Sequence, residues 1–471
     1  MLRPWKLEFS VNYDCEKAVY LQIADAVIES IKGKKLHPGD ALPGSRQLAE
    51  MLKVNRNTVV EALDVLLAEG WLISKERIGT FVADVLPGTD QQPVSRKKSV
   101  EPKGKEQQVR LVFDDGFPDS RLAPMNEIAR AYRQLFNRKS RWQIMGYSNE
   151  FGHSEFRKAI VQMLNFKRGM NVLPDELCIT RGSQMAMYLA AHALLKKGDR
   201  VMVENPGYQP AWQAFRNAGA ELLPVNVDSE GLIVDEVAHY LDQYPDIRAI
   251  YVTPHHQFPT TVTLSLKRRM KLIELSNRYG FTIIEDDYDN EFHFAQRPVL
   301  PVSSHRHLKH FVYIGTWSKI VAPALRIGYL VSSTDVIKKA GEHRKIIDVQ
   351  GDNIMEEALL QLVNEGEIKR HLKRTTPVYK AKRDFFEQIC LKYLAGKAHF
   401  SKPEGGLAFW IVPDKEIDVM GVHERLLAQE IQLLSPDKFS FDKPVSGFRL
   451  GYASLTEEQI ETGIRALAAC F

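Results

Sequence analysis

Apolar side chains recur every three or four positions in three successive N-terminal segments, which predicts three amphipathic helices. Their apolar faces are Tyr20, Ile23, Val27 and Ile31, then Leu48, Ala49 and Leu52, then Val59, Leu63 and Leu66. We expect Gly33 to end the first helix and Ser45 to cap the second. Asn55 can cap the third, which ends near Gly70. Two short apolar runs at 72–74 and 80–82 follow as strands, so the pattern predicts a winged helix-turn-helix.

Farther along, short apolar runs alternate with helical stretches, which predicts an α/β domain with a mostly parallel sheet covered by helices on both faces. The predicted strands are 178–180, 201–203, 250–252, 281–284 and 312–314, and the clearest helices are 185–195 and 266–279. Beyond about Val331 the pattern becomes mainly helical and ends in a helix over 457–468. We expect this last part to form a smaller C-terminal domain.

The stretch from about Pro87 to Arg110 is polar and basic and lacks apolar periodicity, which is typical of a flexible linker. A basic tether can also touch phosphates, although a solvated tether is the simpler interpretation. The predicted organisation is therefore a winged helix-turn-helix over 1–86, a linker over 87–110 and a larger α/β body over 111–471.

Composition adds a few exclusions. A chain of 471 residues is too long for one core, and no apolar run approaches the length that spans a bilayer. The four cysteines are far apart and form no C-x-x-C pair, which fits a reducing cytoplasm and disfavours a structural zinc site. No secretory signal is visible at the N-terminus. The net charge of +4 says nothing by itself about nucleic acid.

The segment Gly315-Thr316-Trp317-Ser318-Lys319 follows a predicted strand, and Arg326 comes shortly after it. A lysine amine can form a Schiff base with an aldehyde while hydroxyl groups and an arginine hold a phosphate beside it. These residues point to pyridoxal 5'-phosphate, with Ser318, Lys319 and Arg326 in those roles. An ordinary surface lysine after a strand is the alternative.

Carboxylates and a phenol follow another strand, in Glu285-Asp286-Asp287-Tyr288, at the end where open α/β sheets bind ligands. A carboxylate against the pyridine nitrogen keeps that nitrogen protonated, and a phenol can contact the ring hydroxyl. A metal site is the alternative for the acidic residues. The chain has no G-x-x-x-x-G-K-[ST] loop, so nucleotide hydrolysis lacks its phosphate cradle.

Weaker signals lie elsewhere in the body. Ser183 and Gln184 open a helix, where backbone amides favour a phosphate, and Tyr208 offers a ring that can stack on a flat cofactor. Arg449 lies on a short apolar strand and needs an anionic partner, either a ligand carboxylate or an internal ion pair. Histidines at 305, 307 and 310 are more simply a solvated loop than a metal site.

The helix-turn-helix carries polar side chains where a recognition helix meets base edges. The candidate DNA-contacting residues are Ser45, Arg46, Asn55, Arg56, Asn57 and Thr58, with Lys75 and Arg77 on the wing. A protein-docking module is the alternative, because helix-turn-helix units occur without DNA.

Residues 18 to 83 resemble the GntR-type winged-helix domain. The matching segments are Leu42-Pro43-Gly44-Ser45-Arg46-Gln47-Leu48-Ala49, Asn55-Arg56-Asn57-Thr58-Val59 and Gly79-Thr80-Phe81-Val82. This resemblance implies a domain that binds double-stranded operator DNA.

Residues from about 110 to 471 resemble fold-type I aminotransferases of the aspartate aminotransferase group. The resemblance implies that Lys319 is the Schiff-base lysine, and that Asp286, Tyr288 and Tyr208 contact the pyridine nitrogen, the ring hydroxyl and the ring face. It places Ser183, Gln184, Ser318 and Arg326 around the phosphate, Arg449 on a substrate carboxylate, and Tyr147 on the phosphate of a neighbouring subunit. One segment departs from the family: its N-P-T-G loop is replaced by His255-His256-Gln257-Phe258-Pro259-Thr260-Thr261. The asparagine contact is then lost or moved to Gln257.

A GntR-like domain joined by a linker to an aminotransferase-like body makes the whole chain similar to the MocR family of bacterial transcription regulators. They imply a cytoplasmic, nucleoid-associated homodimer that binds DNA and senses pyridoxal phosphate or an amino compound. An active aminotransferase with a DNA-binding appendage is the alternative, since the residues suffice for exchange with an amine.

Overall fold

The computed structural model describes residues 9–75, 79–87, 109–138, 141–294 and 299–471. The chain divides into two compact units, residues 1–105 and 106–471. Most of the predicted linker, together with Arg77, lies outside the described residues.

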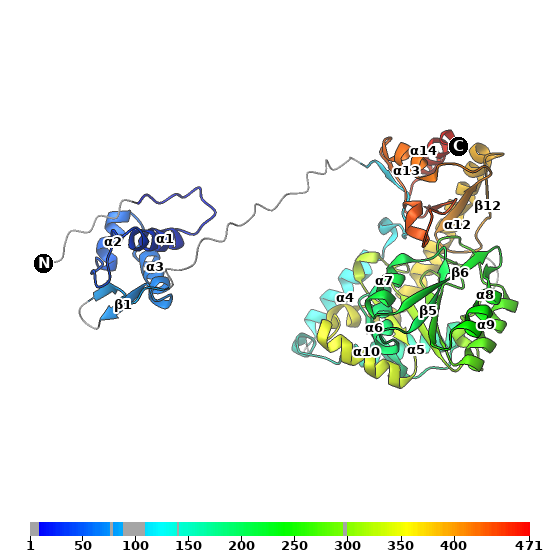
Figure 1. The fold of residues 1–471 in the computed structure, drawn as a ribbon, viewed down its shortest axis with the longest axis horizontal. Helices are drawn as coiled ribbons and strands as arrows, with labels where there is room; N and C mark the ends of the chain where they lie inside the picture. The colour runs from blue at the N-terminus through cyan, green and yellow to red at the C-terminus, as the bar shows by residue number, and fades with distance from the viewer. Residues whose placement is uncertain (1–8, 76–78, 88–108, 139–140, 295–298) are drawn as a thin grey trace. The chain divides into compact units, whose positions relative to one another are not determined.

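The N-terminal unit is the predicted set of three helices and a hairpin (Figure 1). Its elements are α1 (Val19–Lys32), α2 (Ser45–Leu52), α3 (Arg56–Ala68), β1 (Leu72–Lys75) and β2 (Gly79–Val82). The strands pair antiparallel, and apolar residues of α1, α3 and the hairpin form the core. Gly33 follows α1 and Asn55 caps α3 as predicted, because the Asn55 side chain accepts from the Asn57 backbone N–H at 2.9 Å. Ser45 was wrong as a cap: it is the first residue inside α2, and Gly44 holds the cap position.

The body contains an eight-stranded sheet with the order β4-β11-β10-β9-β8-β5-β6-β7. Its strands are β4 (Leu177–Thr180), β5 (Arg200–Asn205), β6 (Glu221–Asp228), β7 (Gly231–Leu232), β8 (Ile247–Val252), β9 (Thr282–Asp287), β10 (Phe311–Thr316) and β11 (Gly328–Val331). The five strands from β10 to β6 run parallel, whereas β11 and β7 are antiparallel to their neighbours. The predicted, mostly parallel sheet is confirmed.

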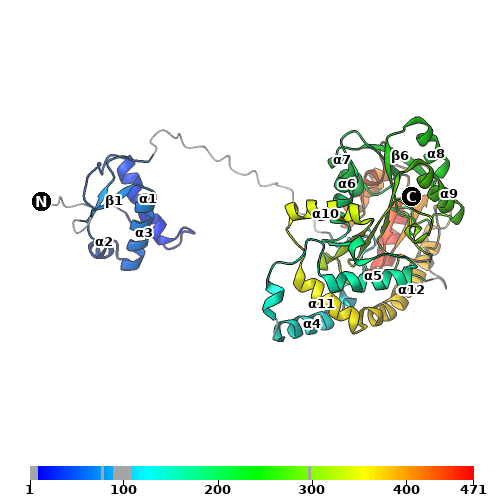
Figure 2. The same ribbon diagram turned by 90° about the horizontal axis from the view of Figure 1, so that it is seen from below.

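Helices cover both faces of this sheet. One face packs on α6 (Ser183–Leu194), α7 (Gln209–Asn217) and α10 (Thr334–Ile347). The other face packs on α8 (Val234–Gln243) and α9 (Leu266–Tyr279), and at its far end on α4 (Met125–Asn137), α5 (Ser154–Arg168) and α11 (Asn353–Asn364). Figure 1 shows α6 and α7 across the sheet from α8 and α9, and Figure 2 shows α4, α5 and α11 together. Successive side chains of a strand point to opposite faces of the sheet. Because helices cover both faces, apolar side chains point to both, and the strands appear in the sequence as nearly continuous apolar runs.

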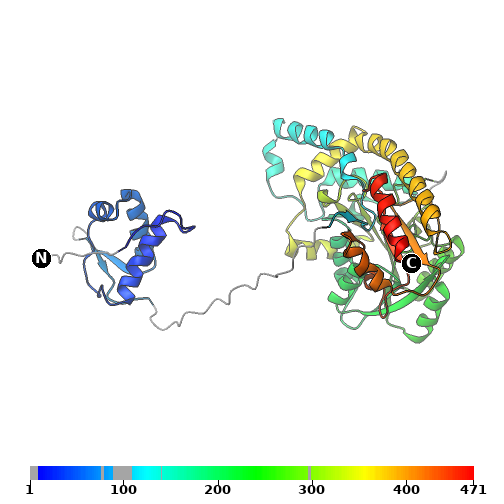
Figure 3. The ribbon, with the colours of Figure 1, turned by 90° about the horizontal axis from the view of Figure 1, so that it is seen from above.

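The smaller C-terminal domain is present, but it begins later than predicted. Since α10 and α11 pack against the sheet of the large domain, only the segments from α12 onward, joined by β3, build the small domain. Its elements are β3 (Leu111–Val112), α12 (Glu367–Leu394), β12 (Ala398–Phe400), β13 (Ala408–Pro413), α13 (Val419–Leu427), β14 (Ile431–Gln432), β15 (Phe448–Gly451) and α14 (Glu457–Ala469). The helix α14 packs beside α12 (Figure 3). The strand β3 pairs with β14. Asp115 and Phe117, which follow β3 in the chain, line a cavity of the body.

Candidate functional site

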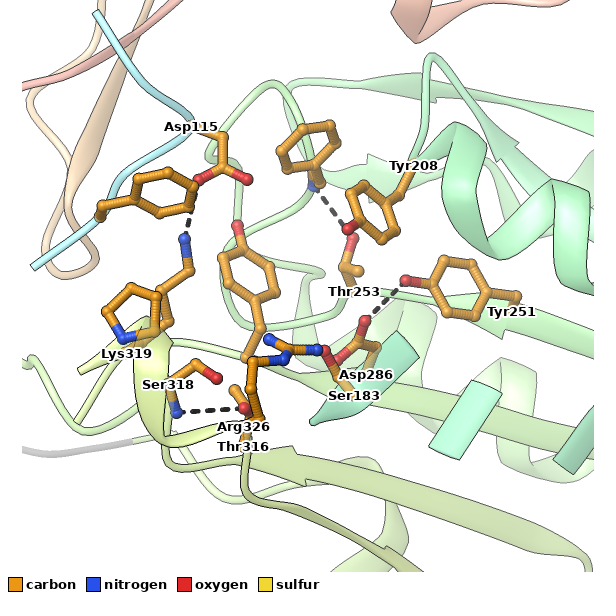
Figure 4. A pocket seen from close by; sticks show the side chains of 14 residues that line it. Asp115, Ser183, Tyr208, Tyr251, Thr253, Asp286, Thr316, Ser318, Lys319 and Arg326 are labelled. Atoms are coloured by element: carbon orange, nitrogen blue, oxygen red, sulfur yellow. Dashed lines mark hydrogen bonds and ion pairs between the residues drawn. The ribbon is translucent and has the colours of Figure 1, made fainter. Parts of the chain in front are cut away.

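A cavity of about 260 Å³ lies at the carboxyl ends of the parallel strands, and it gathers most of the predicted cofactor residues (Figure 4). This is the edge of an open α/β sheet at which ligands bind. Its lining consists of Asp115, Phe117, Ser183, Tyr208, Tyr251, Thr253, Phe258, Asp286, Tyr288, Thr316, Ser318, Lys319, Pro323 and Arg326.

Lys319 follows the buried strand β10 and is itself buried. Its Nζ donates to Oδ1 of Asp115 at 2.8 Å and to the carbonyl oxygen of Gly116 at 3.0 Å. The ring of Phe117 lies 4.4 Å from the same nitrogen. The amine therefore faces the cavity, held by a short segment that leads in from the small domain.

Asp286 is the penultimate residue of the buried strand β9, and its two carboxylate oxygens have different surroundings. Oδ2 accepts from the hydroxyl of Tyr251 at 2.8 Å, whereas Oδ1 is buried and has no hydrogen-bond partner among the described residues. Burial raises the pKa of Asp286 to about 7, although the hydrogen bond from Tyr251 opposes this shift. A cationic N–H placed at Oδ1 would satisfy the carboxylate and stabilise its charged form.

The same cavity contains an anion-binding corner (Figure 4). Ser183 begins α6, where backbone N–H groups favour negative charge, and Arg326 comes close beside it. Gly182 permits that approach: its φ is +79°, and a Cβ there would lie 2.7 Å from Nη2 of Arg326. The hydroxyl oxygen of Ser318 is buried without a hydrogen-bond partner among the described residues. These groups fit a phosphate, and with Asp286 and Lys319 they fit pyridoxal phosphate.

Tyr208 and Tyr288 also line the cavity. Tyr208 packs edge-on against Phe258, with ring centres 5.0 Å apart. The hydroxyl of Tyr288 donates to the carbonyl oxygen of His256 at 2.8 Å and accepts from Nη2 of Arg449 at 3.2 Å. Burial raises the pKa of both phenols, so both are neutral donors near neutral pH.

Three predicted residues do not line the cavity. The side chain of Gln184 donates to the carbonyl oxygen of Pro210 at 3.0 Å. Gln184 therefore contributes only its backbone N–H, in the first turn of α6, to the anion-binding corner. Tyr147 is 90% exposed on the surface of the body. Arg449 lies just behind the cavity.

Arg449 is fully buried on β15 and forms no ion pair within the described residues. Its guanidinium donates to three neutral acceptors: the carbonyl oxygens of Asp115 and Pro259, both at 3.0 Å, and the hydroxyl of Tyr288. An internal salt bridge, the alternative from the sequence, is therefore not what holds it. A buried guanidinium with only neutral acceptors favours an incoming carboxylate.

The loop at 255–261 does not give Gln257 the role of the missing asparagine. The Gln257 amide donates to the carbonyl oxygen of Pro206 at 2.8 Å and accepts from Thr260. It also faces Glu204, whose pKa burial raises to about 7. Because its amide is fully engaged by these groups, Gln257 has no hydrogen-bonding capacity left for a cofactor, and it does not line the cavity. Phe258 faces the cavity instead.

The DNA-contacting candidates among the described residues belong to α2, to α3 with its cap Asn55, and to β1. Arg46, Asn55, Arg56, Asn57 and Lys75 are exposed, whereas Ser45 and Thr58 are half-buried. Nε of Arg56 lies 3.4 Å from the hydroxyl of Ser45, which links the two helices at the turn. The Lys75 amine lies 5.0 Å from the centre of the Phe81 ring.

Sequence reasoning missed Asp115, Tyr251 and Thr253 in the cavity. Tyr251 is the penultimate residue of β8, the strand beside β9, and Thr253 directly follows that strand, so the strand-end rule could have found both. Asp115 carried no such signal. Among the described residues there is no group of histidine, cysteine, aspartate or glutamate side chains that could hold a metal ion. In the same part of the chain, no helix has the length and apolar content needed to cross a bilayer.

Comparisons with known proteins match both units. Residues 115–467 match the family "Aminotransferase class I and II", and residues 19–82 match "Bacterial regulatory proteins, gntR family". The probable rhizopine catabolism regulatory protein MocR of Rhizobium meliloti is 28% identical over 98% of this chain and 95% of its own length. The HTH-type transcriptional regulator TauR of Rhodobacter capsulatus is 26% identical over 95% of each chain.

Among solved structures, the body is similar to LysN, an alpha-aminoadipate aminotransferase of Thermus thermophilus complexed with N-(5'-phosphopyridoxyl)-L-leucine. The TM-score is 0.70 and the identity 26%, over 77% of this chain and 92% of that chain. The body is therefore like that of an enzyme, whereas regulators match the chain along nearly its whole length.

Proposed function

The chain belongs to the aminotransferase class I and II family and carries a gntR-family domain at its N-terminus, and from this we propose a bacterial transcription regulator that uses pyridoxal phosphate to sense an amino compound. The gntR-type unit binds operator DNA, and the body binds the cofactor and its ligand in the cytoplasm as a homodimer. The observation that carries this proposal is the single cavity that joins Lys319, Asp286 and the Arg326 corner in a chain that also has a helix-turn-helix.

Each side chain has a distinct task in this proposal. Lys319 would supply the covalent anchor, and Asp286 would hold the ring nitrogen in its protonated form through Oδ1, the oxygen that Tyr251 leaves free. Ser183, Ser318 and Arg326 would hold the phosphate, and Tyr208 would pack against the ring. The cofactor supplies an aldehyde carbon that exchanges amines reversibly. Arg449 binds the carboxylate of the amino compound, while Tyr288 orients that guanidinium.

The ligand regulates DNA binding only if it prefers one arrangement of the body over another. The cavity is suited to this, because its walls come from both the large domain and the segment at 115–117 that follows β3 of the small domain. A change in how these two domains close is the natural response to a ligand that contacts both.

The proposal is tested by borohydride reduction of the purified protein, followed by peptide mass analysis. We expect a cofactor-sized mass on the peptide that contains Lys319, and its absence in Lys319→Ala. A reduced wild-type protein without that mass contradicts the cofactor assignment. In parallel, the ligand that changes the absorption spectrum is expected to change operator binding, with no effect in Lys319→Ala.

An active aminotransferase is the second candidate, because Lys319 and Asp286 line the same cavity. The family resemblance implies the same pairing of a lysine and an aspartate in a catalytic site. Turnover with an amino acid and a 2-oxo acid distinguishes the two. Sustained turnover favours the enzyme, whereas ligand binding that alters DNA binding without turnover favours the regulator.

A further inference from the structure

Asp115 contacts Lys319 directly, although no motif pointed to it. The carboxylate oxygen lies 2.8 Å from Nζ, and the two side chains are 25% and 11% exposed. The carbonyl of Gly116 accepts a second hydrogen bond from the same nitrogen, and the ring of Phe117 lies against it. A carboxylate, a carbonyl dipole and a ring face together are the surroundings that suit an ammonium ion.

A well-ordered turn presents Asp115 to the lysine. Oδ1 of Asp114 accepts from the backbone N–H groups of Gly116 and Phe117 at 2.8 and 2.7 Å, and its Oδ2 accepts from the hydroxyl of Ser454 at 2.6 Å. The backbone oxygen of Asp115 also accepts from Nε of Arg449. One residue thus contacts both the anchor lysine and the buried arginine.

We propose that Asp115 receives Lys319 when an amine takes the lysine's place on the cofactor, and that this ion pair makes the site retain amines. The inference rests on the proposed function. In the exchange, the incoming R–NH₃⁺ bonds to the cofactor carbon and gives up three protons. The bond from that carbon to the Lys319 nitrogen breaks, and the nitrogen takes up three protons and leaves as an ammonium.

The number of hydrogens on the Lys319 nitrogen explains why Asp115 stabilises the side of the exchange in which the lysine is released. While it is bound to the cofactor, the lysine nitrogen carries one hydrogen at most, so it cannot donate to both Asp115 and Gly116. After release it carries three, and the contacts described above become available. Because the two contacts to Asp115 and Gly116 form together only with the released ammonium, they shift the exchange toward the amine-bound site.

The same contact opposes complete transamination. In that reaction a neutral released lysine acts as the base that moves a proton from the substrate carbon. A Lys319 ammonium paired with Asp115 is withheld from this task. The pair therefore suits a site that holds its amine and reports it.

The test uses the full-length protein loaded with pyridoxal phosphate, with Asp115→Asn as the variant and Asp414→Asn as the control. Asp414 is a carboxylate of the small domain that pairs with His399, away from the cavity lining. Methylamine and L-alanine are the probes, and the change in the visible absorption spectrum measures their affinities. Cofactor content and melting temperature are recorded for each protein.

We expect Asp115→Asn to weaken the affinity for both probes by about tenfold or more, since a hydrogen bond to a charged group is lost. Its cofactor content is expected to match the wild type, and Asp414→Asn to leave the affinities unchanged. Conversion of L-alanine in a single turnover is expected to become faster in Asp115→Asn. Asp115→Glu, which keeps the charge, is expected to retain more amine affinity than the asparagine variant.

Equal amine affinities in wild type and Asp115→Asn overturn the inference, as does a slower single turnover in the variant. A wild-type protein whose spectrum does not respond to saturating methylamine overturns it as well. Failure of the proposed function looks different, because borohydride then traps no cofactor on Lys319 in any of these proteins.

Discussion

The ring of Phe258 covers the guanidinium of Arg449, with the guanidinium carbon 4.7 Å from the ring centre. The same ring packs edge-on against Tyr208 in the cavity wall and against Phe439 of the small domain, with centres 5.0 and 5.8 Å apart. By the family resemblance, Phe258 occupies the asparagine position of the N-P-T-G loop. On that resemblance, a polar side chain is replaced by an aromatic cover over the arginine proposed to bind the ligand.

Arg449→Ala is expected to keep the cofactor on Lys319 but to lose the preference for amino acids over amines without a carboxylate. The physical reason is that a carboxylate would replace neutral acceptors on a buried guanidinium, an exchange worth about tenfold to a hundredfold in affinity. Spectral titration with L-alanine and with ethylamine measures the preference.

Arg465→Ala on α14 is the matched control, because this arginine lies outside the cofactor cavity. If Arg449→Ala discriminates between the two probes as well as the wild type does, the proposal that Arg449 binds the ligand carboxylate is wrong.

Arg56→Ala and Arg46→Ala are expected to weaken operator binding in two different ways. If Arg56 reads a guanine edge, its loss costs about 1–3 kcal/mol and relaxes specificity at one position. If Arg46 contacts a phosphate, its loss weakens all sequences alike and makes the dependence on salt less steep. Binding isotherms at several salt concentrations separate these outcomes.

Lys34→Ala serves as the control, since Lys34 follows α1 and lies outside α2 and α3. The cofactor spectrum is expected to stay unchanged in all three variants. Unaltered isotherms for both arginine variants would count against the assignment of α3 as the recognition helix.

The sequence predicted the elements that have one unambiguous pattern. The buried strands β8 to β10 appear as apolar runs, and α9 has its predicted bounds, because burial on both sheet faces and a helical period each leave a clear signature. Lys319 and Asp286 were predicted from their places, just after one buried strand and near the end of another, and Arg326 from its nearness to Lys319 in the sequence. All three line the same cavity.

Contacts between distant segments were not predictable. Asp115 reaches Lys319 because β3 pairs with β14, two short strands from opposite ends of the body that carry no periodicity of their own. Helices α10 and α11 were placed in the small domain since their pattern does not say which surface their apolar face covers. Ser45 was expected to be a cap because Gly44 and Ser45 are both residues that occupy that position.

Tyr147 is expected to matter only in the dimer. Its side chain is almost fully exposed in the single chain and does not line the cavity, although the family resemblance places it on a neighbouring subunit's phosphate. Sedimentation of the full-length protein is expected to show a homodimer. Tyr147→Phe is expected to keep the dimer and to weaken cofactor binding about tenfold, as the loss of one hydrogen bond to a charged group predicts. A monomer at micromolar concentration, or unchanged cofactor affinity in the variant, would contradict this arrangement.

Asp286→Asn is expected to change how the stability of the cofactor-free protein depends on pH. Burial raises the pKa of Asp286 from an ordinary 3.8 to about 7 in the folded chain. Between these values the folded protein keeps a proton that the unfolded chain has lost. The stabilisation linked to this proton is therefore fully present below pH 3.8 and is lost as the pH rises through 7.

Asparagine cannot ionise, and its side-chain oxygen can still accept from Tyr251, so the variant avoids this loss. The melting temperature of Asp286→Asn minus that of wild type is then expected to increase between pH 5 and pH 8. With pyridoxal phosphate bound, the order at pH 8 is expected to reverse, since the cationic ring nitrogen stabilises the ionised carboxylate. If the difference in melting temperature between the cofactor-free variant and wild type stays constant across this pH range, Asp286 ionises in the folded chain as easily as in water.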